Sequence, residues 1–408
     1  MRSLGPRNLF YAPEFVRLRH FCATQYPGAG SKSEDFLGIA LGHALEALGL
    51  PCSLPSEHYG LALPANLAAI QLHQALQRTD AARVCLCPLD SADDLPDLAF
   101  GPNRIARLTA AELQKLVDPP RLKRVNPTWT FDADRFSKFT WLVIQKIYPL
   151  DRTPAERTIP LLFEPIGRDW GAIEPHRQRV PPAAEKALFT ILLAPWEDWV
   201  KDPEWSWRGF DVPWVYQLDD DIFVRPPPPP SPDTLAWGDE SEGVFGAEHP
   251  KRTPLHEADR VAVSDWLNDV RWSNVTQALE RPLFETPIAH FFVKAFLAEH
   301  PLDEFLAHIT TIEAALGLET DYNQRGATKR VAARVSALLG SEDCGRDYCR
   351  LFNIRSKFLH GRPMGAIPSQ DRIAARRLAR QVQNSLVKAA LGPPWPQSRK
   401  DYLHGLAR

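Results

Sequence analysis

The chain has 408 residues, of which 44% are hydrophobic and 24% charged, a composition typical of globular proteins that excludes a disordered or fibrous one. The net charge is only −2, but residues 325–408 hold 17 Lys and Arg against 5 Asp and Glu, whereas residues 1–324 hold 31 against 45. This length predicts two or three structural units. The basic excess of the last segment predicts a surface that attracts polyanions.

Membrane and disulfide signals are absent from the sequence. No stretch reaches the roughly 18 uncharged apolar residues of a membrane helix, and the start, MRSLGPRNLF, lacks the apolar core of a signal peptide. The six cysteines have neither Cys-x-x-Cys spacing nor the density of a disulfide scaffold. We therefore expect a cytoplasmic protein with reduced cysteines, no metal and no cofactor.

Helix and strand patterns alternate in residues 1–225. Leucines at helical spacing follow a Ser31-x-x-Glu34 capping box, NLAAIQLHQAL predicts a second helix, and Thr109-x-x-Glu112 caps a third. Short apolar runs predict strands at VCLC (84–87), PLLFE (160–164), FTILLA (189–194) and VPWVYQLDDDIFV (212–224). Together these elements predict an α+β domain, for which a sensor or regulatory role is a hypothesis.

Five consecutive prolines, 226–230, follow this domain. Such a run cannot join a helix or a central strand, and it favours an extended, semi-rigid spacer. We predict a linker over residues 226–253; binding of a proline-reading domain is the alternative interpretation.

Residues 254–395 predict an all-α bundle, and residues 396–408 a tail. Five helical patterns, several of them punctuated by Gly or Pro, follow one another at 287–300, 301–317, 327–340, 344–361 and 369–391. The predicted fold class is thus an α+β N-terminal region followed by a helical bundle.

One basic residue stands out in the fourth of these helices. The apolar stripe runs through Tyr348, Leu351 and Phe352 and continues at 358–359, and the position that completes it is Arg355. A guanidinium group on a core-facing stripe needs a partner. His360 follows in the last turn, where the helix dipole favours the imidazolium form, and Gly361 ends the helix.

The string RSKFLHG, Arg-x4-His before a glycine at a helix end, resembles the active-site motif of HEPN ribonucleases. The order TIEAALG, ATKRVAARVSALLG, LFNIRSKFLHG resembles the Apea-like branch of HEPN domains of prokaryotic defence proteins, over residues 287–392. This resemblance implies metal-independent RNA cleavage by the 2′-hydroxyl, in a site completed by a homodimer. It assigns the phosphate to Arg355 and proton transfer to His360, with Ser356 as a helper.

Structural interpretations of the same residues stay open. A buried pair between Glu313 and Arg355 would explain both residues without catalysis. Lys357, Arg376 and Arg380 are candidate RNA contacts, but a solvated helix face explains them as well.

An acidic cluster, Asp219 to Asp221, lies at a predicted strand end. It has no accompanying Glu-x-Lys, so a loop explains it better than a magnesium site.

The leading hypothesis is therefore an endoribonuclease effector, in anti-phage defence or toxin-type growth arrest. Its partners would be RNA, a second copy through the C-terminal bundle, and a phage-derived or protein trigger at the N-terminal domain. Two alternatives are a non-catalytic HEPN module that binds RNA, a nucleotide or a partner protein, and a purely structural adaptor.

Overall fold

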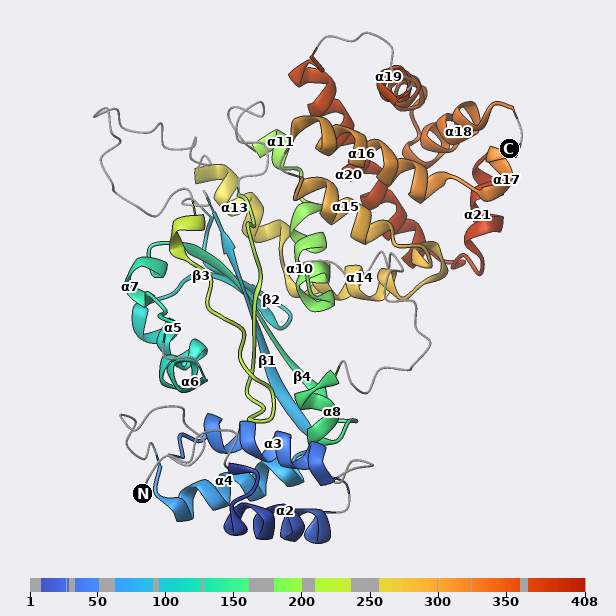
Figure 1. Cartoon of the computed structure of the whole chain (residues 1–408). Helices are drawn as coiled ribbons and strands as arrows, with labels where there is room; N and C mark the ends of the chain where they lie inside the picture. The colour runs from blue at the N-terminus through green and yellow to red at the C-terminus, as the bar shows by residue number, and fades with distance from the viewer. Residues whose placement is uncertain are drawn as a thin grey trace.

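The structure is a computed structural model, and it describes residues 9–26, 28, 34–50, 63–90, 95–125, 128–160, 180–199, 210–235, 257–298, 300–323, 325–359 and 366–407. Within these ranges, helices lie at the N-terminal end, an antiparallel sheet with short helices lies in the middle, and helices make up the C-terminal part (Figure 1). The mixed first half and the helical second half agree with the predicted fold class.

The N-terminal helices have a hydrophobic core of their own. Leu37, Leu41, Leu45 and Leu48 are all buried in it, together with Phe223 from the chain after the sheet. The two helices predicted here are confirmed, while Ser31 of the capping box lies outside the described residues. The helices are α2 (Pro13–Gln25), α3 (Glu34–Ala47) and α4 (Ala65–Gln77).

Among the described residues, the sheet has five antiparallel strands in the order β2-β3-β4-β1-β5. Its long central pair places Cys85 opposite Ile144 and Cys87 opposite Leu142. The strand predicted at VCLC is confirmed within β1, whereas β4 was not anticipated. The strands are β1 (Asp80–Leu89), β2 (Leu98–Phe100), β3 (Asn103–Arg107), β4 (Thr140–Pro149) and β5 (Tyr216–Asp219).

The two faces of the sheet pack against different partners. Side chains at 85, 87, 142 and 144 point into one core, and those at 86, 141 and 143 point into another, as the two-residue period of a strand requires. The second core is covered by short helices, one of which begins with the predicted box between Thr109 and Glu112. These helices are α5 (Ala110–Val117), α6 (Pro119–Val125) and α7 (Ala133–Phe136); α8 (Pro154–Thr158) contacts α3.

Two strand predictions need correction. The first four residues of FTILLA lie in helix α10 (Pro182–Leu192), whose residues 187–192 are all buried. A helix buried on every side loses the polar positions that reveal its period, so its sequence resembles a buried strand. The strand expected over 212–224 is limited to β5, and the two aspartates that follow it, Asp220 and Asp221, pair with Arg78 and Arg157. PLLFE falls largely outside the described residues.

Helix α10 joins the sheet to the bundle. It packs against β1 and β4 and also against α14 (Asp269–Leu279) and α15 (Ile288–Phe296), so one hydrophobic core runs from the sheet into the bundle. The expected boundary at residue 225 therefore does not divide the core. The short α11 (Trp196–Trp199) follows α10 on the same side of the molecule (Figure 1).

The proline-rich stretch begins on the surface of the first half and not in a free spacer. Tyr216 donates a hydrogen bond to the carbonyl of Pro227 (3.0 Å), and Asp233 in the short helix η2 (Pro232–Thr234) accepts one from Arg135 (2.6 Å). The part of the expected linker from 236 to 253 lies outside the described residues.

A hairpin turn provides a second contact between the halves. Gly101, between β2 and β3, has a φ of 55°, and its amide donates to Asp269 (2.6 Å) in α14. A Cβ at this position would lie 2.2 Å from the indole of Trp272. Only glycine combines this backbone conformation with so close an approach.

The C-terminal bundle contains all five predicted helices. The described residues from 257 onward include no strand, and none of the described helices is long and apolar enough to cross a membrane. The expected tail instead forms α21 (Arg399–Leu406), which buries Leu403 in the bundle core. The remaining elements are α13 (Glu257–Trp266), η3 (Pro282–Phe284), α16 (Pro301–Leu316), α17 (Glu319–Tyr322), α18 (Ala327–Leu339), α19 (Glu342–Leu359) and α20 (Ser369–Leu391).

Candidate functional site

Arg355 lies near the end of α19, on the face that packs toward α16. Its Nη2 atom is 3.2 Å from Oε2 of Glu313, and its guanidinium lies 5.5 Å from the ring centre of Phe352. The Arg355 side chain remains 24% exposed and that of Glu313 12%. The pairing anticipated between these two residues is therefore present, while part of the guanidinium still reaches solvent.

Two tyrosines complete this group, which we call the Arg355 cluster (Glu313, Tyr322, Tyr348 and Arg355). Tyr348 lies about two helical turns before Arg355 in α19 and is fully buried, and its hydroxyl has no hydrogen-bond partner among the described residues. Tyr322 is 58% exposed, and its hydroxyl approaches Gly317, one turn after Glu313. The cluster thus joins one carboxylate, one guanidinium and two phenols.

The electrostatics of the cluster follow from burial. Burial raises the pKa of Glu313, and the charge of Arg355 opposes that rise. The pKa of Tyr348 is raised by burial first and by the charge of Glu313 second. Both phenols therefore stay protonated at neutral pH and can only donate or accept hydrogen bonds there.

The apolar stripe predicted for α19 ends earlier than expected. Tyr348 and Leu351 are buried, but Phe358 is 40% exposed and Leu359 55%. The last turn of α19 thus leaves the bundle core and presents two large apolar side chains beside Arg355. Ser356 is half-buried and Lys357 exposed in this turn, and His360 lies outside the described residues.

Arg376 and Arg380 of α20 were expected as RNA contacts, and the structure contradicts this. Their side chains are only 1% and 3% exposed, so they offer no surface to RNA. Arg376 pairs with Glu304 (2.9 Å) and faces Glu197 (3.9 Å), Arg380 pairs with Glu197, and its Nε donates to the carbonyl of Leu192 (2.8 Å). The bundle and the α10–α11 segment thus share a buried ion cluster made of Glu197, Glu304, Arg376 and Arg380.

Sequence reasoning also missed Asp321 and Arg334. Arg334 is 1% exposed, forms an ion pair with Asp321 and donates to the carbonyl oxygens of Leu316 (2.8 Å) and Leu403 (3.0 Å). Of the 17 Lys and Arg in residues 325–408, four that the structure describes are therefore buried in the fold and not available on its surface: Arg334, Arg376, Arg380 and Arg399. A helical pattern alone could have indicated Arg334, because Val331 and Leu338, three residues before it and four after it, are apolar positions on the same face.

The acidic cluster after β5 is structural. Asp219 pairs with Arg83 (3.0 Å), Asp220 with Arg78 (2.8 Å) and Asp221 with Arg157 (2.7 Å). Within the described ranges, no group of three or more His, Cys, Asp or Glu side chains is arranged to hold a metal ion. Burial also raises the pKa of the Cys85 thiol to about 11.

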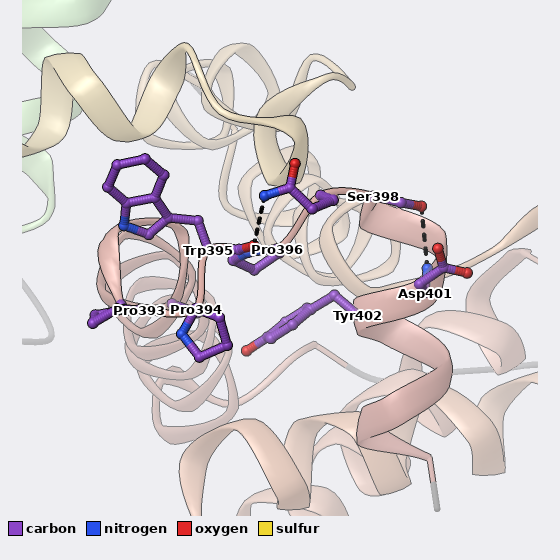
Figure 2. Close-up of a pocket in the computed structure, with 10 residues that line it drawn as sticks. Pro393, Pro394, Trp395, Pro396, Ser398, Asp401 and Tyr402 are labelled. Carbon is purple, nitrogen blue, oxygen red and sulfur yellow. Dashed lines mark hydrogen bonds between the residues drawn. The ribbon is translucent and has the colours of Figure 1, made fainter.

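A pocket of about 470 Å³ lies at the turn between α20 and α21 (Figure 2). It is walled by Pro393, Pro394, Trp395 and Tyr402. Its neighbouring polar groups are engaged within the turn, since the Gln397 amide donates to the carbonyl of Trp395 (3.2 Å) and the Ser398 hydroxyl caps α21. We therefore interpret this pocket as part of the packing of the turn and not as a ligand site.

Comparisons with protein families, with characterised proteins and with solved structures found no match to this chain.

Proposed function

We propose that the C-terminal bundle is a metal-independent endoribonuclease of HEPN type, in which Arg355 binds the scissile phosphate and His360 transfers protons. The observation that carries the proposal is the position of Arg355. Arg376 and Arg380 of α20 are enclosed, but Arg355 keeps part of its guanidinium in solvent at the end of α19, five residues before a histidine. Glu313 holds that guanidinium in place from the core side.

The reaction would proceed by attack of the ribose 2′-oxygen on the adjacent phosphorus. A base takes the 2′-hydroxyl proton, the O2′–P bond forms, the P–O5′ bond breaks, and an acid returns a proton to the leaving 5′-oxygen. The products are a 2′,3′-cyclic phosphate and a free 5′-hydroxyl. Arg355 would neutralise the charge that builds on the phosphate oxygens.

One histidine cannot act as base and acid in the same step, so the proposal requires two chains. The exposed side chains of Phe358 and Leu359 support this, because they place an apolar surface directly beside Arg355. A second copy packed there would bring a second Arg355 and His360 to the same cleft about a two-fold axis. Ser356 would assist in the same turn, and Lys357 would contact the RNA backbone.

The biological setting follows from the resemblance. An RNA-cutting effector in anti-phage defence or growth arrest needs restraint until it is triggered, and residues 1–225 would receive that trigger. The shared core around α10 supports this, since it gives the first half direct contact with the bundle.

The pairing of Arg355 with Glu313 also favours a second candidate function, a non-catalytic module in which Arg355 only stabilises the fold. An RNA-cleavage assay distinguishes the ribonuclease from the non-catalytic module. The purified chain should cut single-stranded RNA in EDTA, and His360→Ala should abolish cleavage, whereas His404→Ala on the exposed face of α21 should not. Equal cleavage by wild type and His360→Ala would reject the ribonuclease and leave the module.

A further inference from the structure

A second pocket, of about 410 Å³, lies between the residue that precedes α11 and the helices of the bundle. Its lining includes Pro195, Trp266 at the end of α13, Arg271 of α14 and Cys344 of α19. Its floor is a single face of α20, since Gln381, Asn384, Ser385 and Lys388 recur at helical spacing. The volume lies within the roughly 300–1,000 Å³ of small-molecule sites.

The lining carries two cations and no carboxylate. Arg271 and Lys388 have no ion-pair partner among the described residues, whereas Arg376, Arg377 and Arg380 of α20 all have one. Burial lowers the pKa of Arg271, and its Nε is buried without a hydrogen-bond partner in the part of the chain that the structure describes. A half-buried guanidinium without a counter-charge is costly, so an anion would stabilise this pocket.

The guanidinium of Arg271 is held in a fixed orientation. It stacks on the indole of Trp266 at 3.9 Å and donates to the side-chain oxygen of Asn384, whose own amide donates to the carbonyl of Leu193 (2.8 Å). Since Nε is buried and Nη2 donates to Asn384, the remaining guanidinium N–H groups are those available to a ligand. They are held in one plane and suit the oxygens of a phosphate, because they can donate hydrogen bonds at little entropic cost.

We propose that this pocket binds a small phosphomonoester that carries a polar ring, such as a sugar phosphate or a nucleoside monophosphate. The phosphate would lie between Arg271 and Lys388. The side chains of Gln381 and Ser385 supply donors and acceptors for the hydroxyl or ring groups, and Pro195 with Leu339 supplies an apolar wall.

This site is separate from the proposed RNA-cleaving site. Cys344 and Arg355 lie on the same helix, eleven residues apart, which is roughly 16 Å along its axis. Binding at the pocket therefore does not depend on whether the bundle cleaves RNA, and it should be unchanged in the His360→Ala chain.

The test is calorimetric titration of the full chain with AMP, UMP and ribose 5-phosphate, with adenosine and inorganic phosphate as the two half-ligands. At least one of the three phosphomonoesters should bind with a Kd below about 1 mM, and adenosine should bind at least tenfold more weakly. Both Arg271→Gln and Lys388→Gln should weaken binding at least tenfold. Lys388 is exposed, so its variant remains informative if Arg271→Gln folds poorly.

Arg281→Gln is the matched control, because Arg281 stacks on Trp395 at 4.0 Å in the same way but outside the pocket. It should bind like wild type. Cys344 gives a second readout: the ligand should slow its alkylation at least threefold, while Cys349, on the same helix but outside the lining, should react as before. Failure of all three phosphomonoesters to bind, wild-type affinity in both pocket variants, or equal binding of adenosine would overturn the proposal.

Discussion

The adjacent residues Glu197 and Asp198 allow a sharp test of how the two halves of the chain are held together. Glu197 is buried between Arg376 and Arg380, whereas Asp198 makes a 3.0 Å pair with Arg377 in which the side chains are 61% and 47% exposed. We predict that Glu197→Ala is strongly destabilising and that Asp198→Ala is nearly neutral.

The difference in magnitude follows from solvation. Removing one partner of a buried pair leaves an uncompensated charge and costs about 3–5 kcal/mol. An exposed pair is screened by water and contributes about 0–1 kcal/mol. At roughly 2–4 °C per kcal/mol for units of this size, Glu197→Ala should lower the Tm by about 6–20 °C and Asp198→Ala by at most about 4 °C.

Scanning calorimetry of the three chains at neutral pH measures both effects. Raising the salt concentration to 1 M should reduce the small Asp198 effect and leave the Glu197 effect nearly unchanged, because ions do not penetrate the buried site. Equal melting of the two variants would refute the buried ion cluster.

Three further predictions concern other parts of the chain. Arg355→Ala should lower the free energy of unfolding by about 2 kcal/mol, a value between those of exposed and buried ion pairs. Adding Glu313→Gln to this variant should recover part of the loss. Urea titrations that show no recovery would contradict the pairing. The pKa of His43 is lowered from 6.5 to about 4, mainly by burial and secondly by the charge of Arg225. The folded chain therefore binds fewer protons at His43 than the unfolded chain. The free energy of unfolding should then fall by at most about 3 kcal/mol as the pH decreases from 6.5 to 4. If a His43→Gln chain lost the same free energy of unfolding over this pH range, the contribution of His43 would be disproved. Gly101→Ala should lower the free energy of unfolding by at least about 2 kcal/mol more than Gly340→Ala. Both glycines have a positive φ, but only Gly101 lies against an indole ring, that of Trp272. Similar Tm values for the two variants would count against the hairpin contact.

The sequence was most informative where elements are long and half-exposed. The five C-terminal helices each alternate apolar and polar positions over many turns, so their period identifies them. Helix α10 and strand β4 lack that contrast, because the second half of α10 and the first half of β4 are fully buried. Periodicity cannot distinguish a buried helix from a buried strand, and this limit explains both misses.

The candidate site was predictable only in part. The Arg355–Glu313 pair joins two charged residues, each of which interrupts the apolar stripe of its own helix, and such an interruption is visible in the sequence. Arg376 and Arg380 also lie beside apolar positions, Ala375 and Ala379, but their partner Glu197 lies about 180 residues earlier. No local pattern links such distant residues, so a basic helix was mistaken for a solvated one.

This long-range pairing bears on how any activity must be assayed. A fragment that begins at residue 254 would keep the bundle helices but lose α10 and Glu197, exposing the apolar side chains that α10 covers and leaving Arg380 buried without a counter-charge. We therefore expect the isolated fragment to be insoluble or to lack a cooperative melting transition, while a fragment from residue 180 should fold at least partly. A fragment from 254 that melts as sharply and as high as the whole chain would show that the bundle does not need the first half. In that case the restraint proposed for residues 1–225 would have to act through some contact other than the shared core.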